Sequence, residues 1–133
     1  TWSWGIDPTR PSIVLDGGAL VAEHPQLGRR LLTASGSPEA LFCENETNAV
    51  RIFGAPAETP YPKDGINDHV LAEAATVNPA QTGTKAAFRY RLDVDAGATA
   101  TVDADISSAP TDIGITNPTG ASTPAASGTE ITL

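Results

Sequence analysis

The stretch KAAFRYRLDVDAGATATVDADI, residues 85–106, decides the fold class. From Ala86 to Val94 every second residue is apolar or aromatic, which is the pattern of a β-strand with one buried face. The segment 95–97, Asp-Ala-Gly, matches a three-residue hairpin loop that ends in a left-handed glycine. Alternation then resumes from Ala98 to Ile106. The stretch therefore predicts a central β-hairpin over residues 85–106, with an alanine-rich inner face over which something bulky must pack.

Shorter strand signals precede this hairpin. Strands are predicted for residues 12–15, 19–23, 29–34, 40–43 and 69–73. The turn signal Asp16-Gly17-Gly18 joins the first two strands into a second hairpin. Residues 54–68 and 78–84 are rich in Pro, Gly and Asn, so they are predicted to be loops.

These elements predict an all-β fold, an antiparallel β-sandwich that is complete or partial, with long polar loops at one end. A chain of 133 residues, 40% of them hydrophobic, fits one domain with one modest core. Residues 1–110 form the predicted sandwich module. Residues 111–128 are mostly Thr, Ser, Ala, Pro and Gly and resemble a linker, and residues 129–133 are predicted to form a terminal strand.

Charge and cysteine content exclude several classes of function. The net charge of -8 disfavours binding to nucleic acid and to anionic membranes. No apolar run approaches the roughly 20 residues that span a bilayer. Cys43 is the only cysteine, so neither an internal disulfide nor a cysteine metal cluster can form. It follows Leu41 and Phe42, which predicts a buried thiol.

Short motifs for metal, phosphate and sugar attachment are incomplete. Residues 93–97 begin like a calcium loop but lack its closing glutamate, and residues 83–85 lack the upstream glycine of a phosphate loop. Residues 45–47 match an N-glycosylation sequon, a motif short enough to occur by chance. His24 and His69 have no companions at metal-ligand spacing. We therefore expect no metal, no cofactor and no catalytic residue.

Trp2 and Trp4 stand two residues apart, so they share one face if the segment is extended. Stacking on a sugar is one interpretation of this pair. Packing in the core or between domains is the one that we favour.

Polar residues gather near predicted strand ends, in segments 44–48, 63–68 and 78–85. Loops grouped at one end of a sandwich can form a site on a rigid scaffold. The candidate residues for ligand or domain contact are Glu44, Asn45, Glu46, Asn48, Arg51, Lys63, Asp64, Asn67, Asn78 and Lys85. Residues 50–53 are expected to return to the core after the first loop. Solvated turns are the alternative, which explains the cationic residues less well than the Asn, Asp and Gly.

Five segments in the same order resemble one known family. They are TWSWG at 1–5, EHPQLGRR at 23–30, LFCENETNAVRIFG at 41–54, YPKDGINDHV at 61–70 and VNPAQTGTKAAFRYRLDVDAGATATV at 77–102. This set is similar to the N-terminal β-sandwich region of bacterial glycoside hydrolases of the family 63 type, which are glucosidase-like or mannosylglycerate-hydrolase-like proteins. The resemblance covers residues 1–110. It departs from the family at Cys43, where Thr is usual, and at residues 101–106, where Arg and Leu usually alternate.

The resemblance implies a non-catalytic module. In the family, the catalytic carboxylic acid and carboxylate belong to a helical toroid, and this chain shows no helical pattern long enough to supply one. The module would dock such a domain or contact carbohydrate, in the cytoplasm if it is part of a family enzyme. The alternative is an assembly subunit of a surface layer, fibre or virion, outside the cell or in the virion, whose tail 111–133 makes contacts between identical subunits.

Overall fold

The computed structural model describes residues 10–108, and the backbone of residues 129–132. Trp2, Trp4 and the linker-like segment 111–128 lie outside the described residues. The strands are β1 (Ser12–Asp16), β2 (Ala19–His24), β3 (Gly28–Ala34), β4 (Glu39–Cys43), β5 (Thr82–Gly83), β6 (Lys85–Arg89), β7 (Thr101–Ser108) and β8 (Thr129–Thr132). The helices are α1 (Ala49–Phe53) and α2 (Gly65–Ala72). Neither helix is long and apolar enough to cross a membrane.

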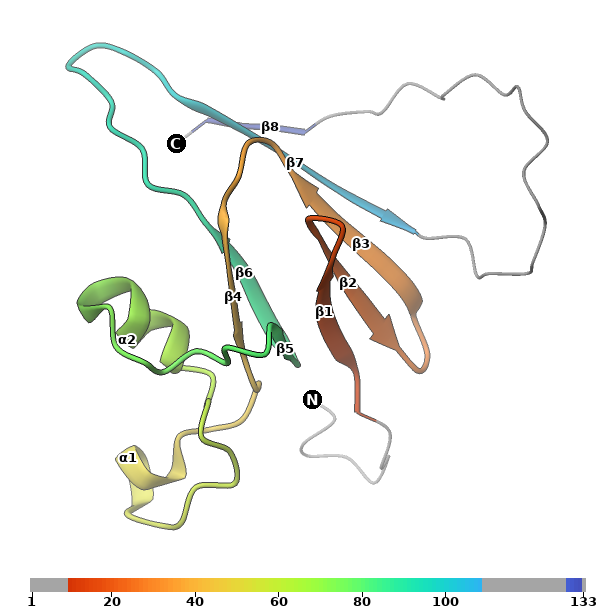
Figure 1. Ribbon diagram of the computed structural model, residues 1–133, viewed down its shortest axis with the longest axis vertical. Coiled ribbons are helices and arrows are strands. Elements are labelled where there is room, and N and C mark those ends of the chain that lie inside the picture. Colours follow the sequence, from red (N-terminus) through yellow and green to blue (C-terminus); the bar gives the residue numbers. More distant parts are fainter. Residues whose placement is uncertain (1–9, 109–128, 133) are drawn as a thin grey trace.

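The strands form two open antiparallel sheets, which confirms the predicted all-β class (Figure 1). Sheet A has the order β5-β1-β2-β3-β7-β8, and sheet B contains β4 and β6. Sheet B lies between sheet A and helix α2 in Figure 1. The described part of the chain is therefore a partial sandwich with a helix on its smaller sheet.

The hairpin predicted around Asp16-Gly17-Gly18 is confirmed. β1 and β2 pair from Ser12 opposite Glu23 to Asp16 opposite Ala19. Gly17 and Gly18 join them with φ values of 56° and 84°. Two left-handed residues in succession match the twist of the flanking strands, and glycine adopts that conformation without steric cost.

The core is formed by the first half of β2 and the end of β4. Its buried residues are Ala19, Leu20, Val21, Leu41, Phe42 and Cys43. Three consecutive buried residues in β4 require cover on both faces, because successive side chains of a strand point in opposite directions. One face of β4 packs on sheet A, and the other carries Cys43, whose Sγ lies 3.5 Å from Thr76 O beside helix α2. Burial of Cys43, predicted from its apolar neighbours, is confirmed.

The central hairpin predicted over residues 85–106 is wrong in its pairing. β6 ends at Arg89 and pairs with β4, whereas β7 pairs with β3 and β8. The turn itself forms, since Ala98 N donates to Asp95 O over 3.0 Å and Gly97 has a φ of 80°. The two arms thus connect sheet B to sheet A instead of pairing with each other. Alternation predicts a half-buried strand, but it does not identify the neighbour with which that strand pairs.

Two further expectations are corrected by the helices. Residues 69–73, predicted as a strand, belong mostly to α2, because a short apolar run does not distinguish helix from strand. Residues 50–53, expected to return to the core, form α1 and are exposed. Asn48 Oδ1 accepts from Arg51 N at the start of α1, and Gly54 ends it in a left-handed conformation. These two caps stabilise a helical turn at Ala49–Phe53, so this segment does not continue into the core.

Candidate functional site

The predicted polar loops do meet at one end of the molecule, around α1 and the start of α2. Glu44 N donates to Tyr61 O over 2.7 Å, and Lys63 N donates to Glu46 O over 2.9 Å. Asn45 N donates to the hydroxyl of Thr84 over 2.8 Å. Backbone bonds therefore hold segments 44–48 and 61–63 side by side, with the start of β6 beside them.

Arg10 binds the two glutamates of the first loop. Its guanidinium lies 3.2 Å from Glu44 Oε2 and 3.0 Å from Glu46 Oε1. The Thr84 hydroxyl also donates to Glu44 Oε2, over 2.8 Å. Both carboxylates are mostly covered. Their contacts fix segment 44–48 to Arg10, just before β1, and to Thr84, just before β6.

Arg51 holds α1 to the first turn of α2. Its guanidinium lies 2.5 Å from Asp64 Oδ2 and 2.5 Å from Asp68 Oδ2, and the Asn48 amide donates to Asp64 Oδ2 over 3.1 Å. The hydrogen bond from Arg51 is the main reason that the pKa of Asp68 lies below its ordinary value of 3.8. Desolvation opposes this shift and is the smaller effect. This ion-pair cluster fixes the orientation of α1.

Of the remaining predicted residues, the two lysines extend this network and Asn78 lies apart from it. Lys63 Nζ donates to the Thr47 hydroxyl over 3.2 Å, and Lys85 Nζ donates to Lys63 O over 2.8 Å. Asn67 is exposed on α2. Asn78 folds its own loop, because its side chain bonds Thr82 O and Ala80 N. Asn78 is thus a turn residue, whereas most other candidates belong to one connected network.

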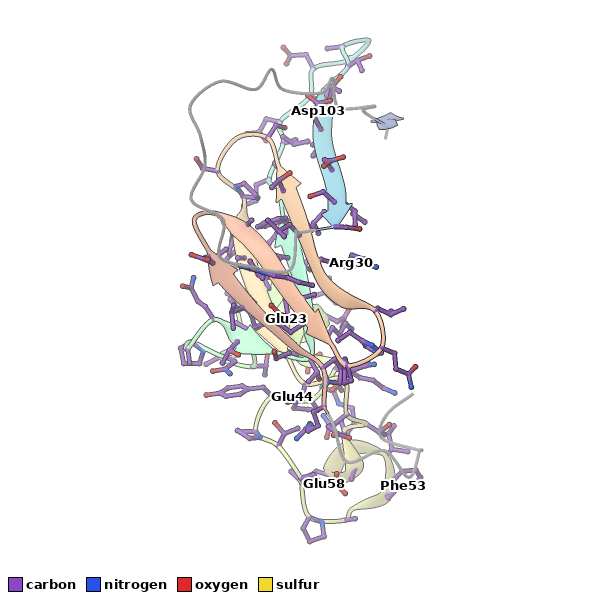
Figure 2. All side chains as sticks on the ribbon, turned by 90° about the vertical axis from the view of Figure 1, so that its right-hand side faces the viewer. Glu23, Arg30, Glu44, Phe53, Glu58 and Asp103 are labelled. Atoms are coloured by element: carbon purple, nitrogen blue, oxygen red, sulfur yellow. The ribbon has the colours of Figure 1, made fainter. Side chains whose placement is uncertain are left out.

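Helix α1 presents apolar side chains to solvent. Val50, Ile52 and Phe53 are 54%, 59% and 73% exposed, and we call them the α1 patch. Figure 2 shows Phe53 and Glu58 at one end of the molecule and Asp103 at the other. The α1 patch is therefore an exposed apolar surface that a network of ion pairs holds in place.

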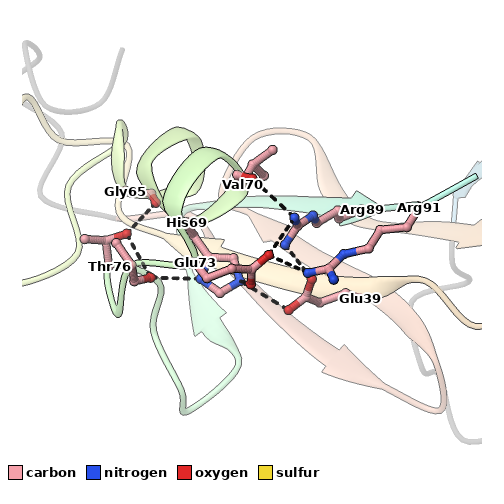
Figure 3. Close-up of polar contacts among 9 residues, drawn as sticks. Glu39, Gly65, His69, Val70, Glu73, Thr76, Arg89 and Arg91 are labelled. Atoms are coloured by element: carbon pink, nitrogen blue, oxygen red, sulfur yellow. Dashed lines mark hydrogen bonds and ion pairs between the residues drawn. The ribbon is translucent and has the colours of Figure 1, made fainter.

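Sequence reasoning missed a second polar cluster, which joins α2 to sheet B (Figure 3). Its charged members are Glu39, His69, Glu73, Arg89 and Arg91. Arg89 lies 3.2 Å from Glu39 Oε2 and 3.0 Å from Glu73 Oε1. Arg89 is the last residue of β6 and Arg91 follows it, and the alternation places both on the face opposite the apolar residues. No signal in the sequence indicated that a helix would cover it.

His69 occupies the centre of that cluster. Its Nδ1 lies 2.9 Å from Ala74 O and its Nε2 lies 3.2 Å from Glu39 Oε1. An acceptor at each ring nitrogen favours the imidazolium, which carries a proton on both. The bond to Ala74 O is the largest reason that the pKa of His69 is raised above 6.5, followed by the bond to Glu39.

Two hollows accompany these clusters. One, of about 200 Å³, is lined by Asn48, Asp64 and Asp68 beside α1. The other, of about 510 Å³, opens between the sheets and is lined by Leu15, Ala40 and Phe88 with a few polar groups. Ligand pockets usually enclose about 300–1,000 Å³, so the hollow beside the predicted loops is small for a disaccharide.

Among the described residues, the charged groups of the loop network form structural ion pairs. The carboxylates of the loop network are bound by Arg10 and Arg51. Within residues 10–108, no group of three His, Cys, Asp or Glu side chains could hold a metal ion. Burial is the main reason that the pKa of the Cys43 thiol is raised, which disfavours the nucleophilic thiolate.

Comparisons with protein-family models, curated proteins and solved structures find no match for this chain. The similarity to family 63 glycoside hydrolases therefore stays a prediction from the sequence segments alone.

Proposed function

We propose that this chain is a non-catalytic β-sandwich module that docks a helical domain of a carbohydrate-active enzyme through its α1 end. The observation that carries the proposal is the α1 patch, in which three exposed apolar side chains project from a helix that Arg51 ties to α2. Stable interfaces combine an apolar centre with a polar rim. The α1 patch and the surrounding charged loops have that composition.

Rigidity of the patch supports docking over a role as solvated turns. Binding costs less entropy when the contact surface is already ordered in the free protein. The Asn48 cap, the Arg51 ion pairs and the bonds between segments 44–48 and 61–63 fix the surface before any partner arrives. The helical nature of the partner rests on the resemblance to family 63 hydrolases.

A binding experiment with isotope-labelled chain tests the proposal. A helical catalytic domain of the family 63 type is titrated in one arm, and α-linked disaccharides and glycosyl-glycerates in the other. We expect the domain to shift the amide resonances of α1 and its loops. Shifts induced by the sugars around Phe88 instead would assign carbohydrate binding to the larger hollow.

Two matched variants localise the interface. Phe53→Asp removes the most exposed member of the α1 patch and is expected to weaken docking by about 2 kcal/mol, as for a central apolar contact. Leu27→Asp changes a residue that is 60% exposed in the β2–β3 turn and is expected to leave docking unchanged. Equal affinity of both variants, or absence of any association by the native chain, argues against the proposal.

Assembly into a larger structure is the second candidate function. β8 pairs with β7 at the edge of sheet A, with Thr132 opposite Thr101 and Thr129 opposite Ala104. An edge strand that follows a long connection can make the same pairing with a neighbouring copy. This candidate is tested by removing the tail, as described in the Discussion.

A further inference from the structure

The larger hollow is lined by strands of both sheets. Leu15 of β1 lines it from sheet A, and Ala40 of β4 and Phe88 of β6 line it from sheet B. Ala40 and Phe88 stand directly opposite each other in the ladder, so their side chains share one face of sheet B. The hollow measures about 510 Å³, within the range of roughly 300–1,000 Å³ that is usual for ligand pockets. Three strands therefore supply an apolar floor to a space of ligand size.

The opening of this hollow carries polar side chains that have no partner among the described residues. Ser37 and Gln81 line the hollow, and both are exposed. Within residues 10–108, neither side chain forms a hydrogen bond. Gly18 and Gly36 also line the hollow, and a Cβ atom at either glycine would contact nothing within 4 Å. The opening therefore offers free space, a hydroxyl and an amide to a ligand.

Gln81 has a backbone conformation that its side chain disfavours. Its φ is 54°, in the left-handed region that glycine adopts without steric cost. Gln81 N donates to Asn78 O over 3.2 Å, and Gln81 O accepts from Leu15 N over 3.3 Å. Glycine would form the same two backbone bonds without the strain. Strained residues of this kind are concentrated at ligand-binding sites, so a role for the Gln81 side chain in binding accounts for its presence.

The charges around the hollow favour an uncharged ligand. Glu39 is the one charged residue among the described residues that line it. Its Oε2 lies 3.2 Å from the guanidinium of Arg89, and its Oε1 lies 3.2 Å from His69 Nε2. A cationic ligand would therefore find this carboxylate already paired. The net charge of -8 on the whole chain opposes an anionic ligand.

We propose that this hollow binds an uncharged ring compound with one or two hydrogen-bonding groups at one edge, as in a phenol. The ring lies against Leu15, Ala40 and Phe88, and its polar edge bonds the Gln81 amide and the Ser37 hydroxyl. A disaccharide suits the hollow less well. It carries many more hydroxyl groups, and those without a partner would lose their hydration at a cost in free energy.

A titration of the isotope-labelled chain tests the proposal, with p-cresol as the probe. We expect p-cresol to shift the amide resonances of Ala40, Gln81 and Phe88. The matched anion p-toluate is expected to bind about tenfold more weakly, because no free cation of the hollow offsets the desolvation of its carboxylate. Maltose is expected to leave these resonances in place. Absence of shifts with p-cresol, equal affinity for p-toluate, or shifts with maltose alone would overturn the proposal.

A variant that fills the hollow locates the site. Ala40→Leu enlarges a residue of the floor and is expected to weaken the binding of p-cresol about tenfold, since the ligand and the new side chain compete for one space. Ala72→Leu is the matched control. It makes the same change at an exposed position of α2 that does not line the hollow, so it should leave the affinity unchanged.

Gln81→Gly separates a role in binding from a role in the turn. Glycine relieves the strain, so the variant should resist urea as well as the native chain or better, yet bind p-cresol several-fold more weakly. Ala80→Gly, at an exposed residue of the same loop, controls for added flexibility and should retain the native affinity. If Ala40→Leu does not fold by circular dichroism, Gln81→Gly decides the question. Native affinity in either variant, once it is shown to be folded, contradicts the proposal.

Discussion

Gly65, the first residue of helix α2, lies where Thr76 and Cys43 leave no space for a side chain. A Cβ atom at this position would overlap the carbonyl oxygen of Thr76 and lie 3.0 Å from Cys43 Sγ. The Thr76 hydroxyl also donates to Gly65 O over 2.7 Å, so the two segments are tied together there. A larger residue would separate α2 from sheet B.

We therefore expect Gly65→Ala to lower the free energy of unfolding by about 1–3 kcal/mol, the usual cost of overpacking. Urea denaturation followed by circular dichroism measures this change. Asn67→Ala, at an exposed position in the same helix, is the control and should have little effect. A Gly65→Ala variant as stable as the native chain would show that α2 and Thr76 move apart freely.

The sequence predicted the burial of some residues correctly and the burial of others wrongly. Burial of Cys43 followed from its apolar neighbours, because a run of apolar residues in a strand indicates cover on both faces. Exposure of Ile52 and Phe53 did not follow, since their hydrophobicity favoured the core. Asn48 and Gly54 cap a helical turn that exposes these side chains. Because Asn and Gly are also common in plain turns, they did not identify the helix.

At the scale of elements, the contact between α2 and sheet B depends on the charge of His69. A group whose pKa is higher in the folded state stabilises that state fully below its unfolded-state pKa. For His69 this contribution is complete below pH 6.5 and is lost as pH rises through the raised folded-state value. Glu73 acts in the opposite sense, because its pKa is lowered in the folded state. Its contribution to stability is present above pH 4.5 and is lost as pH falls through the lowered pKa.

The free energy of unfolding should therefore decrease as pH rises above 6.5 and through the raised pKa of His69, in a range above the titration of Glu73. His69→Gln keeps a neutral hydrogen-bonding side chain and should flatten this dependence. Asn67→Ala should retain it. Urea titrations across the window measure the effect, and an identical slope in His69→Gln would assign the dependence to another group.

Turns and the strands beside them could be predicted from the sequence, whereas the strands with which they pair could be predicted less well. The β1–β2 hairpin followed from Asp16-Gly17-Gly18 because that turn is local. The turn at residues 95–97 formed as well, yet its arms entered different sheets. Helix α2 lies where residues 69–73 were predicted to form a strand. His69 of the helix contacts Glu39 of sheet B, and Glu73, which follows the helix, pairs with Arg89.

At the scale of the whole molecule, β8 closes the β7 edge of sheet A. Deletion of residues 111–133 exposes that edge, and unpaired edges promote association between chains. We expect the shortened chain to be larger than a monomer by light scattering at concentrations where the native chain is monomeric. If the native chain is itself oligomeric and the deletion makes it monomeric, the tail joins subunits and the assembly function gains support. A chain that is monomeric both with and without its tail would exclude that function.

The sequence by itself determined the strand-rich class, the local turns and the buried thiol, because alternation and glycine act within a few residues of each other. The tertiary structure decided the partners of β6 and β7, the cover that α2 gives to sheet B, and the exposure of the α1 patch. It also brought Arg51 to Asp64 and Asp68, and Arg89 to Glu39. These outcomes depend on ion pairs and packing between segments far apart in the chain, and no local pattern encodes which of several compatible segments will meet.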